Sequence, residues 1–261
     1  MNDLAPSKLL DFTGKVVLVT GAGGGIGSGI ARRFAEAGAK LAINYRSNEA
    51  GARAGVAEIE AGGGEAIAIR TDVTKKDEVE RLFAQTAEAF GRIDVLINNA
   101  GSYPIAGLLE MSEADWDSMI ETNLRSAFLC TQEAAKRMIA GGSGGAIVNV
   151  ASIEGSFPAK LHSHYAAAKA GVLAFTKAAA NELGRHGIRV NAVSPGLIWR
   201  EGIEEAWPEG VNRWRNAAPL TRLGMPDDVA DACLFLASPA ASWITGCELR
   251  VDGGVTATAA F

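Results

Sequence analysis

Seven short runs rich in Val, Ile, Leu and Ala alternate along the chain with longer amphipathic segments. Most of these runs are apolar on both faces, which is typical of strands buried between two layers of helices. This alternation predicts an α/β fold, with a doubly wound parallel sheet of about seven strands and helices on both faces. The expected strands are Val16–Thr20, Leu41–Tyr45, Ala66–Arg70, Val95–Asn98, Ala146–Val150, Arg189–Val193 and Cys247–Val251.

No internal repeat or low-complexity linker divides the 261 residues. Because an α/β domain commonly runs past roughly 200 residues, we expect a single domain over 1–261. The glycine-rich stretch Gly141–Gly145 is too short to separate domains and is typical of a surface loop before the fifth strand. The stretch Ile198–Pro219 carries three tryptophans and has no strand period, so we expect a helical flap over a pocket at about 198–219.

Charge and composition argue against several classes of protein. The net charge of −5 disfavours a nucleic-acid surface, because phosphate binding needs a basic face. No stretch approaches the roughly 18 apolar residues of a membrane span, and Met1–Lys15 has no apolar run long enough for a signal peptide. Cys130, Cys233 and Cys247 lie far apart without a paired motif, so we interpret them as reduced core thiols of a cytoplasmic protein and expect no metal site.

A glycine-rich turn, Thr20-Gly-Ala-Gly-Gly-Gly-Ile-Gly27, follows the first expected strand and opens a helix. Glycine permits a tight turn and close backbone approach to a pyrophosphate, which the free N–H groups of the helix N-terminus then bind. The spacing differs from G-x-G-x-x-G, and a merely flexible turn is the alternative. Its place after the first strand favours a dinucleotide site in a Rossmann-type fold. The expected cofactor contacts here are Gly21, Gly23, Gly24, Gly25, Ile26 and Gly27.

The end of the second strand indicates which dinucleotide is bound. NAD-binding versions of this fold place an acidic residue near here to hold the ribose 2′-hydroxyl. This chain has none between Leu41 and Asn48, and it has Arg46 instead, flanked by Tyr45 and Ser47. A guanidinium group suits a 2′-phosphate, so we expect NADP(H) to be preferred over NAD(H). The alternative is that Arg46 is a solvated loop arginine.

Five motifs in this order resemble those of the short-chain dehydrogenase/reductase family, single-domain branch. They are Thr20–Gly27, Asn98-Asn-Ala-Gly101, Ser152, Tyr165-Ala-Ala-Ala-Lys169 and Pro195-Gly196. The resemblance spans Gly14 to about Gly254, and within the family it extends to 3-oxoacyl-carrier-protein reductases and related ketone and sugar reductases. It implies NADP-dependent hydride transfer between a nicotinamide and a carbonyl group or secondary alcohol.

Four residues form the expected catalytic set. Tyr165 and Lys169 are four apart in an Ala-rich segment, so both lie on one helix face. A free tyrosine has a pKa of about 10, and a neighbouring ammonium is expected to lower it. Ser152 follows the fifth strand, where its hydroxyl can hold the substrate oxygen while Tyr165 donates the proton. The resemblance implies that Asn123, in a predicted helix, holds a water beside the lysine. Each alone has a structural alternative: a helix-surface pair, a turn residue or a buried amide.

Further cofactor contacts are implied by the resemblance. Asp72 and Val73 border the adenine, although Asp72 alternatively caps a helix over Lys75–Phe90. Lys169 also binds the nicotinamide ribose, beside Tyr165. The contacts along the ribose and diphosphate are Asn99, Ala100 and Gly101, and those at the nicotinamide carboxamide are Pro195, Gly196 and Ile198.

The substrate pocket is expected between the loops after strands four, five and six. Its aromatic residues form either a lid over an apolar substrate or the flap's own small core. The Gly141–Gly145 loop lacks the basic residues that carrier-protein reductases usually display, which leaves small ketones, keto sugars and quinones open beside 3-oxoacyl thioesters. The candidate substrate residues are Ser102, Tyr103, Glu154, Phe157, His162, Trp199 and Trp207.

The sequence leaves other functions of the same fold open and also predicts the kind of partner and the oligomeric state. A non-catalytic NADP-binding sensor is the second alternative, and a dehydratase or epimerase of the same fold usually has a longer chain. The expected partner is a small-molecule carbonyl or alcohol, in the direction of reduction. Small residues over Tyr165–Leu183 suit close helix packing, and Ile244–Gly254 resembles the part that relatives use to pair subunits, so we expect a homotetramer.

Overall fold

The computed structural model describes residues 5–257, so the prediction of one domain over 1–261 extends beyond it at both ends. Seven parallel strands form one sheet in the order β3-β2-β1-β4-β5-β6-β7. The order reverses beside β1, where Val17 pairs with Leu41 of β2 and Val95 of β4, and this confirms the doubly wound sheet. The strands are β1 (Val16–Val19), β2 (Lys40–Tyr45), β3 (Ala66–Arg70), β4 (Val95–Asn98), β5 (Gly145–Val150), β6 (Ile188–Pro195) and β7 (Glu248–Val251).

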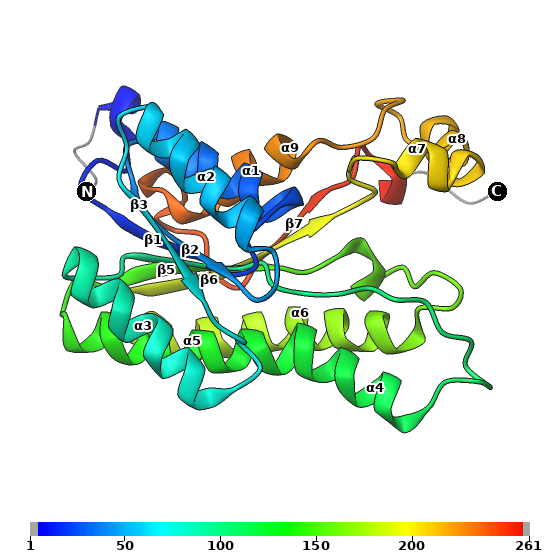
Figure 1. Cartoon of the computed structure of the whole chain (residues 1–261), viewed down its shortest axis with the longest axis horizontal. Helices are drawn as coiled ribbons and strands as arrows, with labels where there is room; N and C mark the ends of the chain where they lie inside the picture. The colour runs from blue at the N-terminus through cyan, green and yellow to red at the C-terminus, as the bar shows by residue number, and fades with distance from the viewer. Residues whose placement is uncertain (1–4, 258–261) are drawn as a thin grey trace.

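Two layers of helices enclose the sheet. Helices α1, α2 and α9 cover one face, α3, α5 and α6 cover the other, and α4 extends the second layer (Figure 1). A small pair, α7 and α8, projects beyond the ends of β6 and β7. The helices are α1 (Gly25–Glu36), α2 (Glu49–Ala61), α3 (Lys76–Phe90), α4 (Glu113–Ile120), α5 (Ser126–Ala140), α6 (Ser163–Leu183), α7 (Ile203–Ala206), α8 (Pro208–Ala217) and α9 (Pro226–Ala237).

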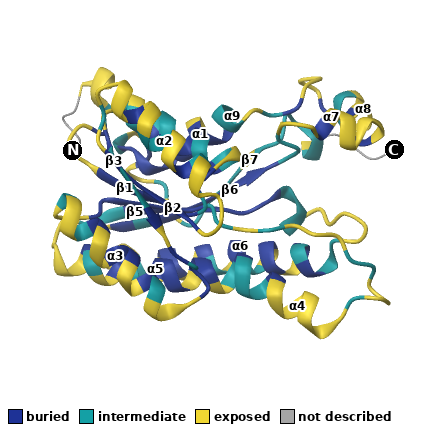
Figure 2. Ribbon diagram, viewed as in Figure 1, coloured by how far each residue is buried: buried dark blue, intermediate teal, exposed yellow. Residues whose placement is uncertain are grey.

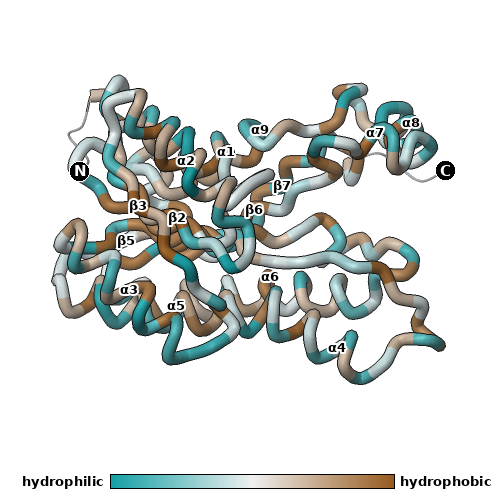
Figure 3. Tube along the Cα trace, in the orientation of Figure 1, coloured by the Kyte–Doolittle hydropathy of each residue, from teal (hydrophilic) through white to brown (hydrophobic). Residues whose placement is uncertain are grey.

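Alternate residues of the central strands fill two cores. Val17 and Val19 of β1 pack with Phe34 of α1, whereas Leu18 between them packs with Leu82 and other residues on the opposite face. This is the two-sided burial that the apolar runs predict. Figures 2 and 3 show the buried, hydrophobic strands between helices whose outer faces are exposed and polar.

Element boundaries differ from the sequence-based expectations at two informative places, and the segment 198–219 is helical as expected. Gly145 belongs to β5, so the glycine-rich loop is shorter than predicted. Helix α3 begins at Lys76 and Lys75 is its N-cap residue, so Asp72 does not cap it. The expected flap is helical, and Trp214 packs in its own small core with Ile203, Val211 and Leu223.

Candidate active site

The glycine-rich turn lies at the carboxyl end of β1, against the segment that follows β4. The backbone N–H of Gly21 donates to Asn44 Oδ1 at 3.1 Å. Gly21 has a φ of +65°, and a Cβ there would lie 2.8 Å from the Cα of Ala100. Both constraints favour glycine. Helix α1 begins immediately afterwards, and its N-cap Gly24 supplies no side-chain hydrogen bond, so the N–H groups of its first turn are available to an anion.

Hydrogen bonds join this turn to the Asn98–Gly101 motif. Thr20 Oγ1 accepts from the backbone N–H groups of Asn99 and Ala100, each at 3.0 Å. In return, Asn99 Nδ2 donates to the carbonyl oxygens of Thr20 and Gly21 at 3.0 Å. A Cβ on Gly27 would meet that Nδ2 atom at 2.5 Å. The two loops expected to hold the diphosphate and ribose are therefore fixed to each other.

Asn48 also supports the turn, and sequence reasoning missed it. Its Nδ2 donates to the carbonyl oxygen of Gly23 at 2.6 Å, while its Oδ1 accepts from Gly51 N at 3.1 Å and caps α2. Asparagine directly before a helical pattern is a recognisable N-cap signal. Nothing in that signal reveals that the same side chain reaches back across the fold to the glycine-rich turn.

Arg46 and Asp72 follow neighbouring strands, β2 and β3. Arg46 is exposed, and its guanidinium forms no hydrogen bond or ion pair to any described residue, although Arg70 Nε donates to its carbonyl oxygen at 3.3 Å. Burial alone would raise the pKa of Asp72, but hydrogen bonds from Thr74 and the charge of Arg46 hold it below the usual range. Asp72 is thus ionised, and Arg46 is free to meet an external anion.

Ser152 and Tyr165 meet at the carboxyl end of β5. Ser152 is buried directly after the strand, and Tyr165 lies in the first turn of α6. Burial raises the pKa of Tyr165 to about 12, while its hydrogen bond with Ser152 acts in the opposite direction. The phenol is therefore protonated at neutral pH, which suits proton donation to a carbonyl oxygen.

Lys169 lies one turn further along α6, on the same face as predicted. Its Nζ is 5.7 Å from the centre of the Tyr165 ring and donates to the carbonyl oxygen of Val150 at 2.8 Å. Burial lowers the pKa of Lys169 to about 8. The expectation that its charge lowers the pKa of Tyr165 is wrong for this structure, because burial dominates the pKa of both groups.

Asn123 lies in a widened π-helical turn, Glu121–Arg125, between α4 and α5, where the sequence predicts a regular helix. Its Nδ2 donates to the carbonyl oxygens of Ser102 at 2.9 Å and Met119 at 3.2 Å. Its buried Oδ1 has no partner among the described residues. A Cβ on Gly101 would lie 2.6 Å from this Oδ1 and 3.7 Å from Lys169 Nζ. The unpaired oxygen therefore faces the region of Lys169, where a water molecule would satisfy it.

Two candidate substrate residues flank the Tyr165 ring. Tyr103 and His162 meet it edge-on, with centroid separations of 6.4 and 5.8 Å. His162 Nδ1 lies 2.8 Å from Glu154 Oε2, and Glu154 donates its backbone N–H to Ser152 Oγ at 3.1 Å. Three predicted substrate residues thus contact the predicted catalytic set: Tyr103 and His162 contact Tyr165, and Glu154 contacts Ser152.

Other candidate substrate residues are partly occupied by contacts of their own. The Phe157 ring lies beneath the guanidinium of Arg250 at 4.9 Å, and the Trp207 ring beneath that of Arg213 at 5.8 Å. Trp199 is 40% exposed. The aromatic residues of the flap therefore include both a small core, around Trp214, and exposed rings.

The segment after β6 also approaches the site. The backbone N–H of Gly196 donates to the carbonyl oxygen of Val251 at 3.0 Å, and a Cβ on Gly196 would overlap the Trp214 ring, 2.5 Å away. Ile198 pairs with Gly224. The flap is thus fastened at both of its ends, next to the position predicted for the nicotinamide.

Comparison with known proteins identifies the family. A family model described as enoyl-(acyl carrier protein) reductase matches residues 21–256. The chain is 44% identical over 245 residues to a 3-oxoacyl-[acyl-carrier-protein] reductase of Synechocystis sp., covering 94% of this chain and 98% of that protein. A solved short-chain type dehydrogenase/reductase from Mycobacterium marinum superposes with a TM-score of 0.92 at 38% identity, over 97% of this chain and 100% of that one. The chain belongs to the short-chain dehydrogenase/reductase family.

A second relative in this family acts on a sugar. The chain is 42% identical over 246 residues to the L-rhamnose 1-dehydrogenase (NAD(P)(+)) of Azotobacter vinelandii, covering 92% of this chain and 96% of that enzyme. The predicted family and enzyme class are confirmed: the chain is a short-chain dehydrogenase/reductase, an oxidoreductase acting on C=O or CH–OH groups.

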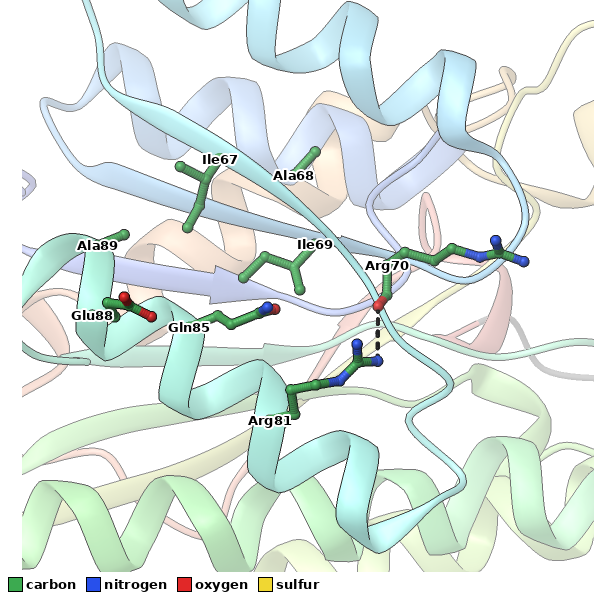
Figure 4. A pocket seen from close by; sticks show the side chains of 8 residues that line it. All are labelled: Ile67, Ala68, Ile69, Arg70, Arg81, Gln85, Glu88 and Ala89. Carbon is green, nitrogen blue, oxygen red and sulfur yellow. Dashed lines mark hydrogen bonds between the residues drawn. The ribbon is translucent and has the colours of Figure 1, made fainter.

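A hollow at the other edge of the sheet lies apart from these residues. It lies between β3 and α3 and contains none of the catalytic candidates (Figure 4). Arg81 spans it by donating to the carbonyl oxygen of Arg70 at 3.4 Å. The lining residues are Ile67, Ala68, Ile69, Arg70, Arg81, Gln85, Glu88 and Ala89.

The residues of the short-chain dehydrogenase/reductase site fit a nicotinamide dinucleotide. The N-terminus of α1 without a side-chain cap, the glycine positions without room for a Cβ and the unpaired Asn123 Oδ1 are all consistent with it. Within residues 5–257, no group of three or more His, Cys, Asp or Glu side chains is placed to hold a metal ion.

Proposed function

We propose that this chain reduces a carbonyl group with NADP(H), using Tyr165 as the proton donor and, in reverse, as the base. The observation that carries the proposal is the meeting of Ser152 and Tyr165 at the carboxyl edge of the sheet, with Lys169 Nζ buried 5.7 Å from the centre of the Tyr165 ring. Bound NADPH would supply the hydride. Ser152 and Tyr165 would hold the substrate oxygen, and Tyr165 would protonate it as negative charge develops there.

We propose that Lys169 and Asn123 resupply the proton to Tyr165. Lys169 Nζ is fixed by the carbonyl oxygen of Val150, and Asn123 Oδ1 faces the same region with an unused acceptor site. A water molecule held by Asn123 would connect the ammonium to solvent. The π-helical turn supports this role, since such turns widen a helix locally and frequently occur at functional sites.

NADP(H) is the proposed cofactor because of the residues after β2. Arg46 is exposed, has no protein partner for its guanidinium, and occupies the place where NAD-specific relatives carry a carboxylate. The remaining proposed contacts are those predicted from the sequence: Gly21–Gly27, Tyr45–Ser47, Asp72, Val73, Asn99–Gly101, Tyr165, Lys169, Pro195, Gly196 and Ile198.

The proposed substrate is a small molecule of one of two classes. The Synechocystis relative supports a 3-oxoacyl thioester, and the Azotobacter relative supports a small sugar or hydroxylated ketone. A specific feature of this chain favours the second class: the Glu154–His162 pair places polar groups beside Tyr165.

NADPH oxidation with a panel of carbonyl compounds tests the proposal. The panel should include acetoacetyl-CoA, butan-2-one, 3-hydroxybutan-2-one and aldoses, and wild type should be compared with Tyr165→Phe. We expect the variant to lose about 100- to 10,000-fold in kcat/KM, the usual contribution of a general acid. Equal rates would show that Tyr165 is not the proton donor. NADPH binding without turnover of any compound would favour the alternative of a non-catalytic NADP-binding sensor.

We also propose a cytoplasmic homotetramer in which the whole chain is one NADP-binding domain and 198–219 is the substrate flap. Exposed apolar side chains, including Leu109 on the loop before α4 and Trp243 before β7, support burial against other subunits. No helix within residues 5–257 is long and apolar enough to cross a membrane. Light scattering at micromolar concentration tests the assembly, and a monomeric mass would refute it.

A further inference from the structure

Glu154 and His162 form a carboxylate–imidazole pair beside Tyr165 that the proposed proton transfer does not use. His162 Nδ1 lies 2.8 and 3.0 Å from the two carboxylate oxygens of Glu154. Both side chains are largely buried, with 18% and 20% exposed. Because a carboxylate only accepts hydrogen bonds, Nδ1 must donate, and the pair holds the imidazole in one orientation.

The pair is fixed to the residues that would hold the reacting oxygen. Glu154 lies two residues after Ser152 and donates its backbone N–H to the Ser152 hydroxyl at 3.1 Å. The His162 ring is 5.8 Å from the Tyr165 ring at an interplanar angle of 66°. A substrate whose oxygen lies between Ser152 and Tyr165 therefore presents its neighbouring atoms to His162.

His162 Nε2 is the free end of the pair. It forms no hydrogen bond to any of residues 5–257, although the ring is four-fifths buried. Nε2 is not itself fully enclosed, so a bound group can reach it, and a hydrogen bond formed at this largely sheltered ring adds affinity. Because Glu154 holds the imidazole in one orientation, only a group at one position can form this hydrogen bond with Nε2.

We infer that the Glu154–His162 pair recognises a hydroxyl group on the carbon next to the reacting carbonyl carbon. The substrate class would then be a 2-hydroxy ketone or 2-hydroxy aldehyde, or the corresponding vicinal diol in the direction of oxidation. This inference rests on the proposed function, because it takes Ser152 and Tyr165 as the groups that hold the reacting oxygen.

The chemistry of Nε2 favours a hydroxyl over a thioester carbonyl. With Nδ1 donating to Glu154, Nε2 of the neutral ring is an acceptor, whereas Nε2 of the charged ring is a donor. A hydroxyl both donates and accepts, so it fits either state. A thioester carbonyl only accepts and therefore fits the charged ring alone. His162 would be a specificity residue and Glu154 a positioning residue that acts through it.

The test compares 3-hydroxybutan-2-one with butan-2-one, two ketones that differ only in the neighbouring hydroxyl. The measured quantity is the ratio of their kcat/KM values with NADPH, in wild type and in His162→Leu. Comparing the two ratios cancels the intrinsic difference in ketone reactivity. We expect the ratio to fall roughly 10- to 100-fold in the variant, as for a lost hydrogen bond to a buried, carboxylate-oriented group. A ratio within twofold of wild type would overturn the inference.

Two further variants keep the test decisive if His162→Leu does not fold. Glu154→Gln retains an acceptor for Nδ1 and should keep most of the ratio, whereas Glu154→Ala should lower it. Equal ratios in these two variants would contradict the positioning role of Glu154. His186→Leu is the matched control: His186 follows the far end of α6 and contacts Arg185, so the ratio should not change.

Acetoacetyl-CoA, a ketone with a neighbouring thioester carbonyl and no hydroxyl, tests whether the pair selects a hydroxyl group or any polar oxygen. If His162→Leu lowers kcat/KM for acetoacetyl-CoA as much as for 3-hydroxybutan-2-one, the pair does not select a hydroxyl and the inference is wrong. If wild type reduces none of these ketones, or Tyr165→Phe reduces them equally well, the proposed function itself fails. If Tyr165→Phe is inactive but the ratio does not respond to His162→Leu, only the further inference fails.

Discussion

Lys169 Nζ donates its hydrogen bond to the carbonyl oxygen of Val150, 2.8 Å away, and not to Tyr165, whose ring centre is 5.7 Å from it. The ammonium is thus anchored to the end of β5, the same strand that Ser152 follows. Its burial disfavours the charged form and lowers the pKa from 10.5 to about 8. This side chain is retained at a cost in stability, which is common for catalytic groups.

Lys169→Met should therefore stabilise the protein while removing activity. The pKa difference corresponds to about 3 kcal/mol, and the lost hydrogen bond to Val150 offsets about 1 kcal/mol, so we expect a net gain of about 2 kcal/mol at pH 7. In wild type, the buried lysine destabilises the folded state by the full amount below pH 8, where it is charged in both the folded and the unfolded state. This destabilisation disappears as the pH rises to about 10.5. Urea unfolding at pH 7 and pH 10 measures the difference, and a less stable variant at pH 7 would contradict this account.

Ser152→Ala should shift the pH dependence of alcohol oxidation upward. Burial raises the pKa of Tyr165 to about 12, and the hydrogen bond with Ser152 is the contact that opposes this rise. Without it, the phenolate needed as base forms at higher pH. We expect kcat/KM to fall about 100-fold or more, as when one oxyanion donor is removed, and its apparent pKa to increase. A lower or unchanged apparent pKa would show that the hydroxyl does not tune the phenol.

The sequence predicted the fold more completely than it predicted the contacts within the site. Strand–helix alternation and apolar strands give the sheet, because local pattern and two-sided burial agree there. The π-helical turn at Asn123 and the partner of Lys169 depend on tertiary packing, which no local pattern encodes. Likewise, Asn48 was recognisable as a helix cap but not as the hydrogen-bond donor to the carbonyl oxygen of Gly23.

Arg46→Asp should reverse the cofactor preference. The substitution replaces a guanidinium that has no protein partner with a carboxylate that repels a 2′-phosphate and accepts from a ribose hydroxyl. We expect kcat/KM with NADPH to fall about 100-fold, while that with NADH changes less than about threefold. Arg53→Ala is the control, since Arg53 lies nearby on α2 but is exposed and paired with Glu49 at 2.7 Å. A wild type that prefers NADH would contradict the role given to Arg46.

Gly27→Ala should weaken the glycine-rich turn by forcing it apart from the Asn99 segment. A Cβ at Gly27 would lie 2.5 Å from both Asn99 Nδ2 and the carbonyl oxygen of Gly21, which the Asn99 side chain joins. We expect a loss of about 1–3 kcal/mol in unfolding free energy, typical of overpacking, and weaker NADPH binding. Gly55→Ala is the matched control: this α2 glycine has no neighbour closer than 3.5 Å, so the added methyl should stabilise by about 0.5–1 kcal/mol. Urea unfolding and NADPH fluorescence titration of both variants measure the effects, and equal behaviour would mean that the turn tolerates the displacement of Asn99.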